Sequence, residues 1–310
     1  MTAALPAVDA RTRARAELGM LLVVIVWGAN FGIVKWTLAE IPPFAFAAFR
    51  FSVSAICLCA IAWIREGPPR FPPGTAIRVL WLGIAGNSIY QVLFMIGLTR
   101  TSVGNVALLA GCSPVLVALF GWLTGIEQLS RTMIAGVGLC VLGIALVVGV
   151  HDAAFTHSNL LGDLAIVVAA VAWAAYTVGV RTVSDKVSVT WLTAATTLAG
   201  APLLLLVGGR QLAAVEWGTL STRTWIALAY TTLISLVLAY LIWNASIRLV
   251  GSVRTSVFSA GMPVVGMILA WPLVGERPRL VQVVGSVLIV GGVLLARWTG
   301  GQRGRGAAGQ

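Results

Sequence analysis

Apolar runs of about 20 residues recur along the whole of this 310-residue chain, and each is long enough to cross a bilayer as a helix. This feature constrains the fold more than any other. Only 10% of the residues are charged, against about 25% in typical soluble proteins, and 59% are hydrophobic. The chain has too little polar surface for a water-soluble globule, so a soluble enzyme is excluded.

The runs predict helices rather than strands. They are longer and richer in glycine than the alternating strands of about ten residues that build an outer-membrane barrel. Charges, prolines and polar clusters divide the chain into ten candidate spans. These are 18–39, 43–64, 77–98, 102–124, 131–150, 160–182, 189–208, 223–246, 251–274 and 279–298.

The distribution of basic residues predicts the orientation in the membrane. The formal net charge is +11, but Lys and Arg are scattered singly between apolar runs, which argues against a nucleic-acid partner. When the N-terminus is placed inside, most of them fall in cytoplasmic segments. We therefore expect a multi-pass protein of a bacterial inner membrane with both termini cytoplasmic, including tails at 1–17 and 299–310.

The second half of the chain repeats the first. Pro114 and Pro263 stand 149 residues apart, and so do Glu127 and Glu276. Internal similarity at a fixed spacing indicates a duplicated structural unit. Two glycine pairs share this spacing, Gly136 with Gly285 and Gly143 with Gly292. At a slightly different spacing of 146 residues, the segment that begins at Trp27 aligns with the segment that begins at Trp173.

The repeats are expected to be inverted, because each contains five spans and an odd number turns the second copy upside down. We predict an all-α membrane protein with repeats at 18–150 and 160–298 around a central cavity. Inverted repeats related by an axis in the membrane plane are typical of secondary transporters, which bind substrate near the midplane between the repeats.

These motifs resemble the drug/metabolite transporter superfamily, in its ten-helix type with two tandem EamA domains. The resemblance is carried by Trp-Gly-Ala-Asn at 27–30, its counterpart at 173–176, and the Pro, Glu and Gly series named above. Within this group the chain looks most like the bacterial aromatic amino acid exporters. The resemblance implies a carrier of small metabolites.

Aromatic and amide side chains fall on shared helix faces and are the candidate substrate-binding residues. Residues spaced i, i+3 and i+4 share one face of a helix. Aromatic bodies with polar tips suit an amphipathic solute, although such stripes also serve helix packing, and buried amides also join helices. The candidates are Trp27, Asn30, Phe31, Asn87, Tyr90, Gln91, Phe94, Trp173, Tyr176, Thr177, Ser235, Tyr240 and Trp243.

The repeated prolines and acids have separate expected roles. Pro114 and Pro263 lie at matching places in their spans, where each produces either a gating bend or a static kink. Glu127 and Glu276 are expected to be structural, capping the next helix or pairing with nearby arginines. The structural glycines Gly136, Gly143, Gly285 and Gly292 are expected to let two helices approach closely.

Arg50 is the most costly residue, since it stands well inside the second predicted span. Two interpretations are open. The side chain extends to the outer interface and pairs with Glu40 or Asp163, or it attracts the carboxylate of a substrate.

The sequence thus predicts a secondary transporter, not an enzyme, that functions as a monomer. It would export aromatic or apolar amino acids by alternating access, with the lipid bilayer and a small-molecule substrate as its partners. No catalytic triad, metal-ligand set or phosphate-binding motif occurs, so we expect no cofactor and no metal. The alternatives are a multidrug efflux carrier for organic cations, whose charge aromatic faces attract, and a non-transporting membrane scaffold.

Overall fold

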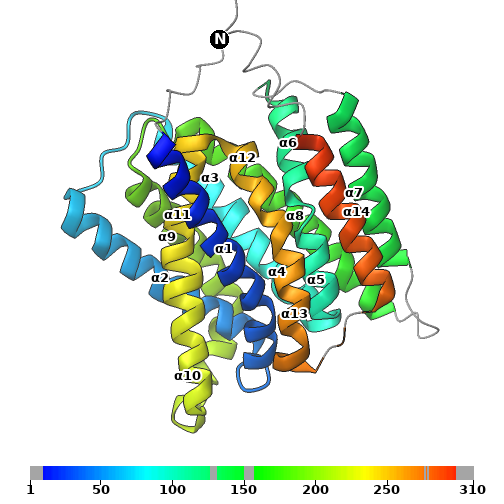
Figure 1. The fold of residues 1–310 in the computed structure, drawn as a ribbon. Helices are drawn as coiled ribbons and strands as arrows, with labels where there is room; N and C mark the ends of the chain where they lie inside the picture. The colour runs from blue at the N-terminus through cyan, green and yellow to red at the C-terminus, as the bar shows by residue number, and fades with distance from the viewer. Residues whose placement is uncertain (1–9, 126–130, 150–156, 276, 278, 298–310) are drawn as a thin grey trace, which may run out of the picture.

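The computed structural model describes residues 10–125, 131–149, 157–275, 277 and 279–297. In these residues every regular element is helical (Figure 1). Eight helices in the described chain are long and apolar enough to cross a membrane. Two shorter apolar stretches, Ile134–Gly143 and Leu280–Gly292, bring the number to the ten spans predicted. The expected all-helical membrane architecture is confirmed.

The first five spans contain seven α-helices, because the third and fourth spans are interrupted. The first helix begins at Ala10, ahead of the predicted start, since its Ala- and Arg-rich beginning is a good helix former. The elements are α1 Ala10–Thr37, α2 Pro43–Glu66, α3 Thr75–Gly83, the π-helical segment Ile84–Ile89, α4 Tyr90–Arg100, α5 Val103–Ala110, α6 Ser113–Leu123 and α7 Arg131–Gly149.

The last five spans follow the same plan. Their third span is again interrupted by a π-helical segment, and their fourth by a tight 3-10 turn. The elements are α8 His157–Val183, α9 Val189–Ala213, the turn Trp217–Thr219, α10 Thr222–Ala229, the π-helical segment Tyr230–Leu238, α11 Ala239–Val250, α12 Ser252–Val257, the 3-10 turn Phe258–Gly261, α13 Met262–Val274 and α14 Leu280–Arg297.

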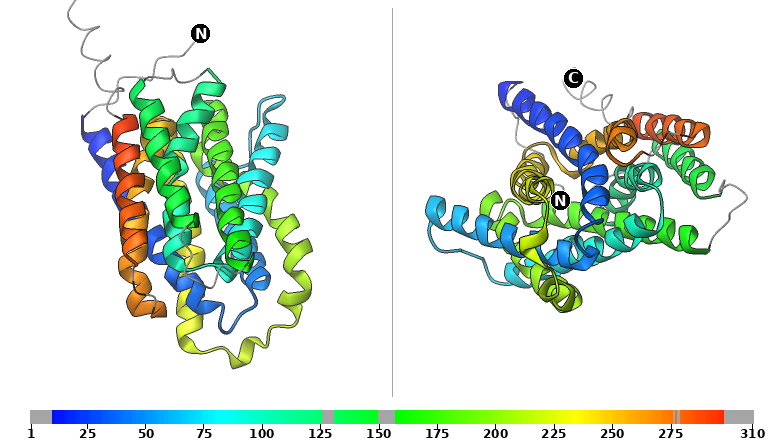
Figure 2. Two further views of the ribbon diagram at one scale, coloured as in Figure 1. Left: turned by 90° about the vertical axis from the view of Figure 1, so that its right-hand side faces the viewer. Right: turned by 90° about the horizontal axis from the view of Figure 1, so that it is seen from below.

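The two repeats run in opposite directions through the bundle. The helix α1 begins, and α14 ends, at one end of the bundle, which we call the termini end (Figures 1 and 2). The helix α8 begins at the other end, the far end, which also holds the link between α1 and α2. The repeats are therefore inverted relative to each other.

The interruptions fall at equivalent places in the two repeats. The π-helical segments occupy the third span of each, and the breaks at Gly111 and Gly261 occupy the fourth. Pro114 and Pro263 lie in the first turn of α6 and α13, directly after these breaks, rather than in the middle of a continuous helix. Proline suits the first helical turn because its missing N–H has no partner there in any case.

Contacts between the repeats obey the same symmetry. The helix α1 packs on α11 and α13, and its counterpart α8 packs on α4, α5 and α6. The helices α2 and α9 form one pair of equivalent spans, and α7 and α14 form another.

The four glycines expected to be structural lie where α7 meets α14. A Cβ on Gly143 would stand 3.0 Å from the carbonyl O of Gly285, and a Cβ on Gly292 would stand 2.6 Å from that of Gly136. The backbones approach so closely that larger side chains do not fit.

Candidate functional site

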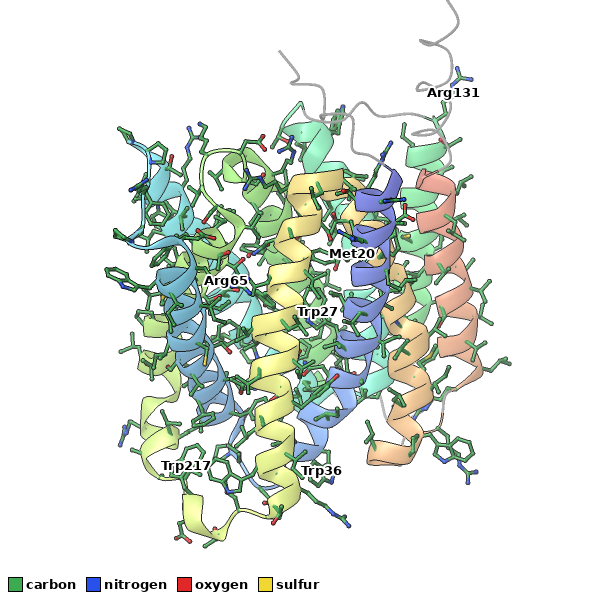
Figure 3. All side chains as sticks on the ribbon, turned by 60° about the vertical axis from the view of Figure 1, so that its left-hand side comes forward. Met20, Trp27, Trp36, Arg65, Arg131 and Trp217 are labelled. Carbon is green, nitrogen blue, oxygen red and sulfur yellow. The ribbon has the colours of Figure 1, made fainter. Side chains whose placement is uncertain are left out.

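A cavity lies between the repeats, at the level of the interrupted spans. Its volume is about 60 Å³, room for a few water molecules and less than the roughly 300 Å³ of the smallest common ligand pockets. Trp27, on its wall, lies about half-way along the bundle (Figure 3). The lining residues are Trp27, Asn30, Phe31, Arg50, Tyr90, Gln91, Phe94, Ala110, Ser113, Ile166, Ala169, Ala170, Trp173, Ser235, Leu236, Tyr240 and Met262.

The repeat-equivalent residues Trp27 and Trp173 meet at the cavity. Their ring centroids are 5.5 Å apart in an edge-to-face arrangement. Tyr240 contacts both rings, at 5.7 Å from Trp27 and 5.6 Å from Trp173. The ring of Tyr90 also contacts that of Trp173, with centroids 5.3 Å apart. Aromatic pairs of this geometry attract each other, so the wall is an ordered cluster of rings with polar tips.

Two amides on the cavity wall carry buried atoms without a hydrogen-bond partner. These are Oδ1 of Asn30 and Nε2 of Gln91. Buried polar atoms are nearly always paired, so an unpaired acceptor and an unpaired donor on residues that line one cavity require an explanation. Neither atom bonds another helix, which disfavours helix joining as the role of these two groups. In the described structure both atoms lack a hydrogen-bond partner.

Arg50 lines the same cavity and is only 2% exposed, so the expectation that it reaches the interface is wrong. Its Nε and Nη2 both donate to the carbonyl O of Thr231, at 3.2 and 2.9 Å. The guanidinium also stands over the ring of Phe46, 4.8 Å from its centroid. The helix α2 is held against the π-helical segment of the second repeat, and this packing buries Arg50.

Neither carboxylate considered as a partner of Arg50 bonds to it. Glu40 accepts hydrogen bonds from the backbone N and the Oγ of Ser221, at 2.9 and 2.8 Å. These bonds hold the pKa of Glu40 below its ordinary value. Asp163 accepts bonds from Asn105. Within the described chain Arg50 is thus a buried cation that no carboxylate contacts by a hydrogen bond or an ion pair.

Nine of the thirteen candidate binding residues line the cavity, and four do not. Tyr176 exchanges hydrogen bonds with Asn244 instead. Asn87 packs against Gly200, and the ring of Trp243 lies tilted against that of Trp27, with centroids 5.1 Å apart. Thr177 is fully buried away from the cavity, and its Oγ1 has no partner. Arg50, for which the sequence left a substrate-binding role open, lines the cavity as well. Ser113 and Met262 are among the lining residues that the sequence did not indicate. Glu127 and Glu276 lie outside the described residues.

Buried polar contacts close the far end of the bundle. The Nζ of Lys35, on α1, donates to the carbonyl oxygens of Leu98 and Thr101 at 2.6 and 2.8 Å, at the end of α4. Asn105 donates to both carboxylate oxygens of Asp163, at 3.4 and 3.3 Å. Gln282 in turn donates to Asn105 at 2.9 Å. Five spans are joined by this network.

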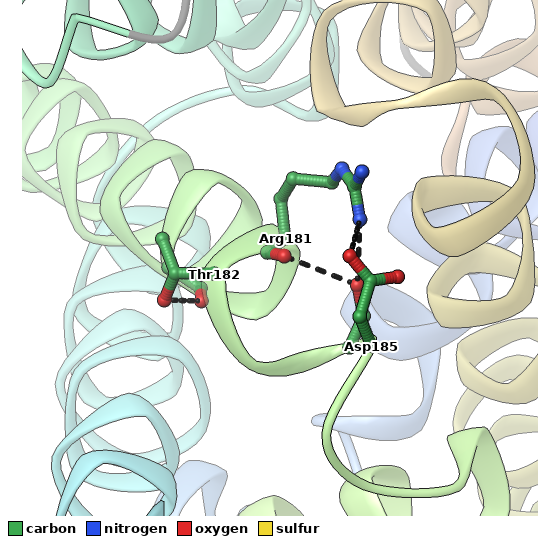
Figure 4. A network of polar contacts seen from close by, with 5 residues as sticks. Arg181, Thr182 and Asp185 are labelled. Carbon is green, nitrogen blue, oxygen red and sulfur yellow. Dashed lines mark hydrogen bonds and ion pairs between the residues drawn. The ribbon is translucent and has the colours of Figure 1, made fainter. Parts of the chain in front are cut away.

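The equivalent contacts are absent at the termini end, as far as the structure describes it. Arg181, the counterpart of Lys35, pairs with Asp185 of the following turn at 2.8 Å (Figure 4). Glu17 and Arg254, which occupy the positions equivalent to Asp163 and Asn105, are exposed, and no hydrogen bond or ion pair between them is found in the described chain. Within the described residues, one set of contacts is made and its repeat-related copy is not.

The family model for EamA-like transporters matches residues 14–149 and 160–298, once in each repeat. The chain belongs to the EamA-like transporter family. The two matched segments coincide with the two sets of five spans, so the architecture of this EamA protein is a duplicated domain. It is a membrane transporter and not an enzyme.

Individual relatives agree with this assignment. This EamA transporter is 33% identical over 276 residues to the uncharacterized transporter YyaM of Bacillus subtilis, covering 88% of this chain and 90% of that protein. It is 27% identical to a probable amino-acid metabolite efflux pump of Salmonella typhimurium, covering 89% and 92%. A solved structure titled "Crystal structure of protein" shares the fold, with a TM-score of 0.66 and 22% identity, covering 92% of this chain and 97% of that one.

Proposed function

We propose that this EamA transporter exports aromatic or apolar amino acids across the bacterial inner membrane. The observation that carries the proposal is the cavity between the repeats, whose lining residues include aromatic rings in edge-to-face contact and two amides with unpartnered atoms. Such a wall offers ring contacts to an apolar side chain and hydrogen bonds to a polar head. The printed name of the Salmonella relative, an amino-acid metabolite efflux pump, supports the same class.

The cavity disfavours both alternatives. A multidrug carrier for organic cations would place a positive charge beside Arg50, and two like charges about 5 Å apart repel by roughly 3 kcal/mol at an effective dielectric constant of 20. Unpartnered polar atoms at mid-membrane lower the stability of the protein. A non-transporting scaffold would gain nothing from a cavity whose residues carry such atoms.

Alternating access is supported by the difference between the two ends of the bundle. The bonds from Lys35 to the carbonyl oxygens of Leu98 and Thr101 act as a gate that closes the far end. At the termini end, Arg181 pairs with Asp185 at the end of its own helix instead. Exchange of the two repeats' conformations would release Lys35 and would let Arg181 bind the equivalent carbonyl groups of Ile247 and Val250. The same exchange would bring Glu17 to Arg254. We assign the termini end to the cytoplasm on the basic-residue distribution, which makes this state closed to the outside.

The cavity has to widen before an amino acid fits. The spans have points where they can deform to widen it. These points are the π-helical segments and the breaks beside Pro114 and Pro263, where the regular α-helical hydrogen-bond pattern is already interrupted. Gly111 and Pro263 touch across the repeat interface, since a Cβ on Gly111 would stand 2.4 Å from Cγ of Pro263. Movement at one break is therefore transmitted to the other through this contact.

Uptake into liposomes containing the purified protein tests the proposal. Labelled tryptophan, phenylalanine, a neutral sugar and an organic dication are compared, with and without a pH gradient. We expect saturable flux of the two amino acids at least tenfold above empty liposomes, and no flux of the dication. Flux of the dication without flux of either amino acid would refute the amino-acid proposal in favour of the drug carrier.

A further inference from the structure

We propose that Arg50 is the residue that binds the carboxylate group of the transported solute. The inference rests on the proposed function and deepens it, because it restricts the substrates to solutes that carry a carboxylate. Amino acids and related organic acids satisfy this requirement. Amines and amides with the same side chains do not.

The first support is the state of the guanidinium. A buried arginine is costly in a membrane protein unless an anion or several acceptors satisfy it. Here one backbone oxygen, that of Thr231, takes both bonds of Nε and Nη2. In the described chain no bond from Nη1 is found, and the side chain forms part of the cavity wall. A guanidinium has five N–H donors in a planar fork, so it retains donors that suit a carboxylate.

The second support is the set of groups that share the cavity with Arg50. Nε2 of Gln91 is an unpartnered donor, and Oδ1 of Asn30 is an unpartnered acceptor. Donors from Arg50 and Gln91 fit a carboxylate, while the acceptor on Asn30 fits an ammonium group. The cavity therefore has complementary groups for both ends of a zwitterion, with the aromatic rings left for the side chain.

A purely structural role makes a different prediction. If Arg50 only fastens the carbonyl of Thr231 to α2, its replacement alters stability and flux for all solutes equally. If Arg50 binds carboxylate, its replacement removes the preference for solutes that carry one. Selectivity, rather than total activity, distinguishes the two roles.

The experiment compares competitors of labelled phenylalanine uptake into liposomes with wild-type protein. Unlabelled phenylalanine and phenylalaninamide differ in the carboxylate and share the ring and the ammonium group. We expect the amide to compete at least tenfold more weakly, since it leaves the guanidinium unpaired. Competition by the amide within threefold of phenylalanine overturns the inference while the proposed function stands. Absence of any phenylalanine uptake defeats the proposed function and this inference with it.

Two variants complete the test. In Arg50→Gln the difference between phenylalanine and its amide should fall to less than threefold, whatever flux is left. In Arg210→Gln, which removes an exposed arginine at the end of α9, the tenfold difference should remain. Full discrimination in a folded Arg50→Gln protein overturns the assignment. Should that variant fail to fold, the wild-type comparison still overturns the assignment if the amide competes within threefold of phenylalanine.

Discussion

Replacement of Trp173 by alanine is expected to reduce amino acid flux at least tenfold. The ring of Trp173 lies at the centre of the aromatic cluster, within 5.6 Å of the rings of Trp27, Tyr90, Tyr240 and Trp243. Its loss removes a stacking surface on the cavity wall and frees its neighbours to turn into the space. Each lost ring contact is worth about 0.5–1.5 kcal/mol, and about 1.4 kcal/mol is a tenfold change in binding.

Two further variants separate transport from folding. Trp173→Phe keeps a ring at the same place and should retain most of the flux. Trp63→Ala removes a tryptophan that is 59% exposed on α2 and away from the cavity, and it should transport normally. Thermal unfolding in detergent identifies any variant that is simply destabilised. Wild-type flux in folded Trp173→Ala, Trp27→Ala, Asn30→Ala and Tyr90→Ala would contradict the cavity assignment.

Addition of one methyl group at Gly208 is expected to weaken the fold by about 3 kcal/mol. A Cβ on Gly208 would stand 2.2 Å from the carbonyl O of Phe44, at the start of α2. Because this is a contact with backbone, no side-chain rotation relieves it, and the pair α2 and α9 must separate. Thermal unfolding of Gly208→Ala in detergent should therefore occur well below the wild-type temperature.

The adjacent glycine is a matched control with the opposite expected sign. A Cβ on Gly209 would meet nothing within 4 Å. Alanine is favoured over glycine in a helix by about 1 kcal/mol, so Gly209→Ala should be neutral or slightly stabilised. If both variants unfold at the same temperature, the close approach of α2 and α9 is not as described.

The spans and their duplication could be read from the sequence because both depend on patterns that the membrane enforces. Apolar runs have to match the bilayer thickness, and paired motifs such as Pro114 and Pro263 show the repeat directly. The stripe of Trp27, Asn30 and Phe31 was likewise predictable, because side chains at this spacing share a helix face whatever surrounds them.

Other features depend on tertiary packing and left no readable signal. The π-helical segments Ile84–Ile89 and Tyr230–Leu238 lack a distinguishing composition. Asn87 shares a stripe with Tyr90 and Gln91, yet the π-helical turns rotate it toward Gly200 and out of the cavity. For Arg50 the sequence indicated a costly charge, but its direction depends on α2 packing against Tyr230–Leu238, a contact between distant parts of the chain.

Solute is expected to occupy the cavity between the repeats and to reach it alternately from both sides. A single cysteine on the cavity wall measures this directly. The four native cysteines, Cys57, Cys59, Cys112 and Cys140, are first replaced by alanine. Ser235→Cys then places a thiol in the cavity, and Thr219→Cys places one in the exposed link between α9 and α10 as a control.

Reaction of these thiols with a membrane-impermeant reagent is followed in liposomes, with reagent on either side and with or without phenylalanine. We predict that Ser235→Cys reacts from both sides and that phenylalanine slows both reactions, while Thr219→Cys reacts from one side at a rate that phenylalanine leaves unchanged. Reaction of Ser235→Cys that is confined to one side, or that phenylalanine does not slow, would show that solute does not reach this cavity alternately from both sides.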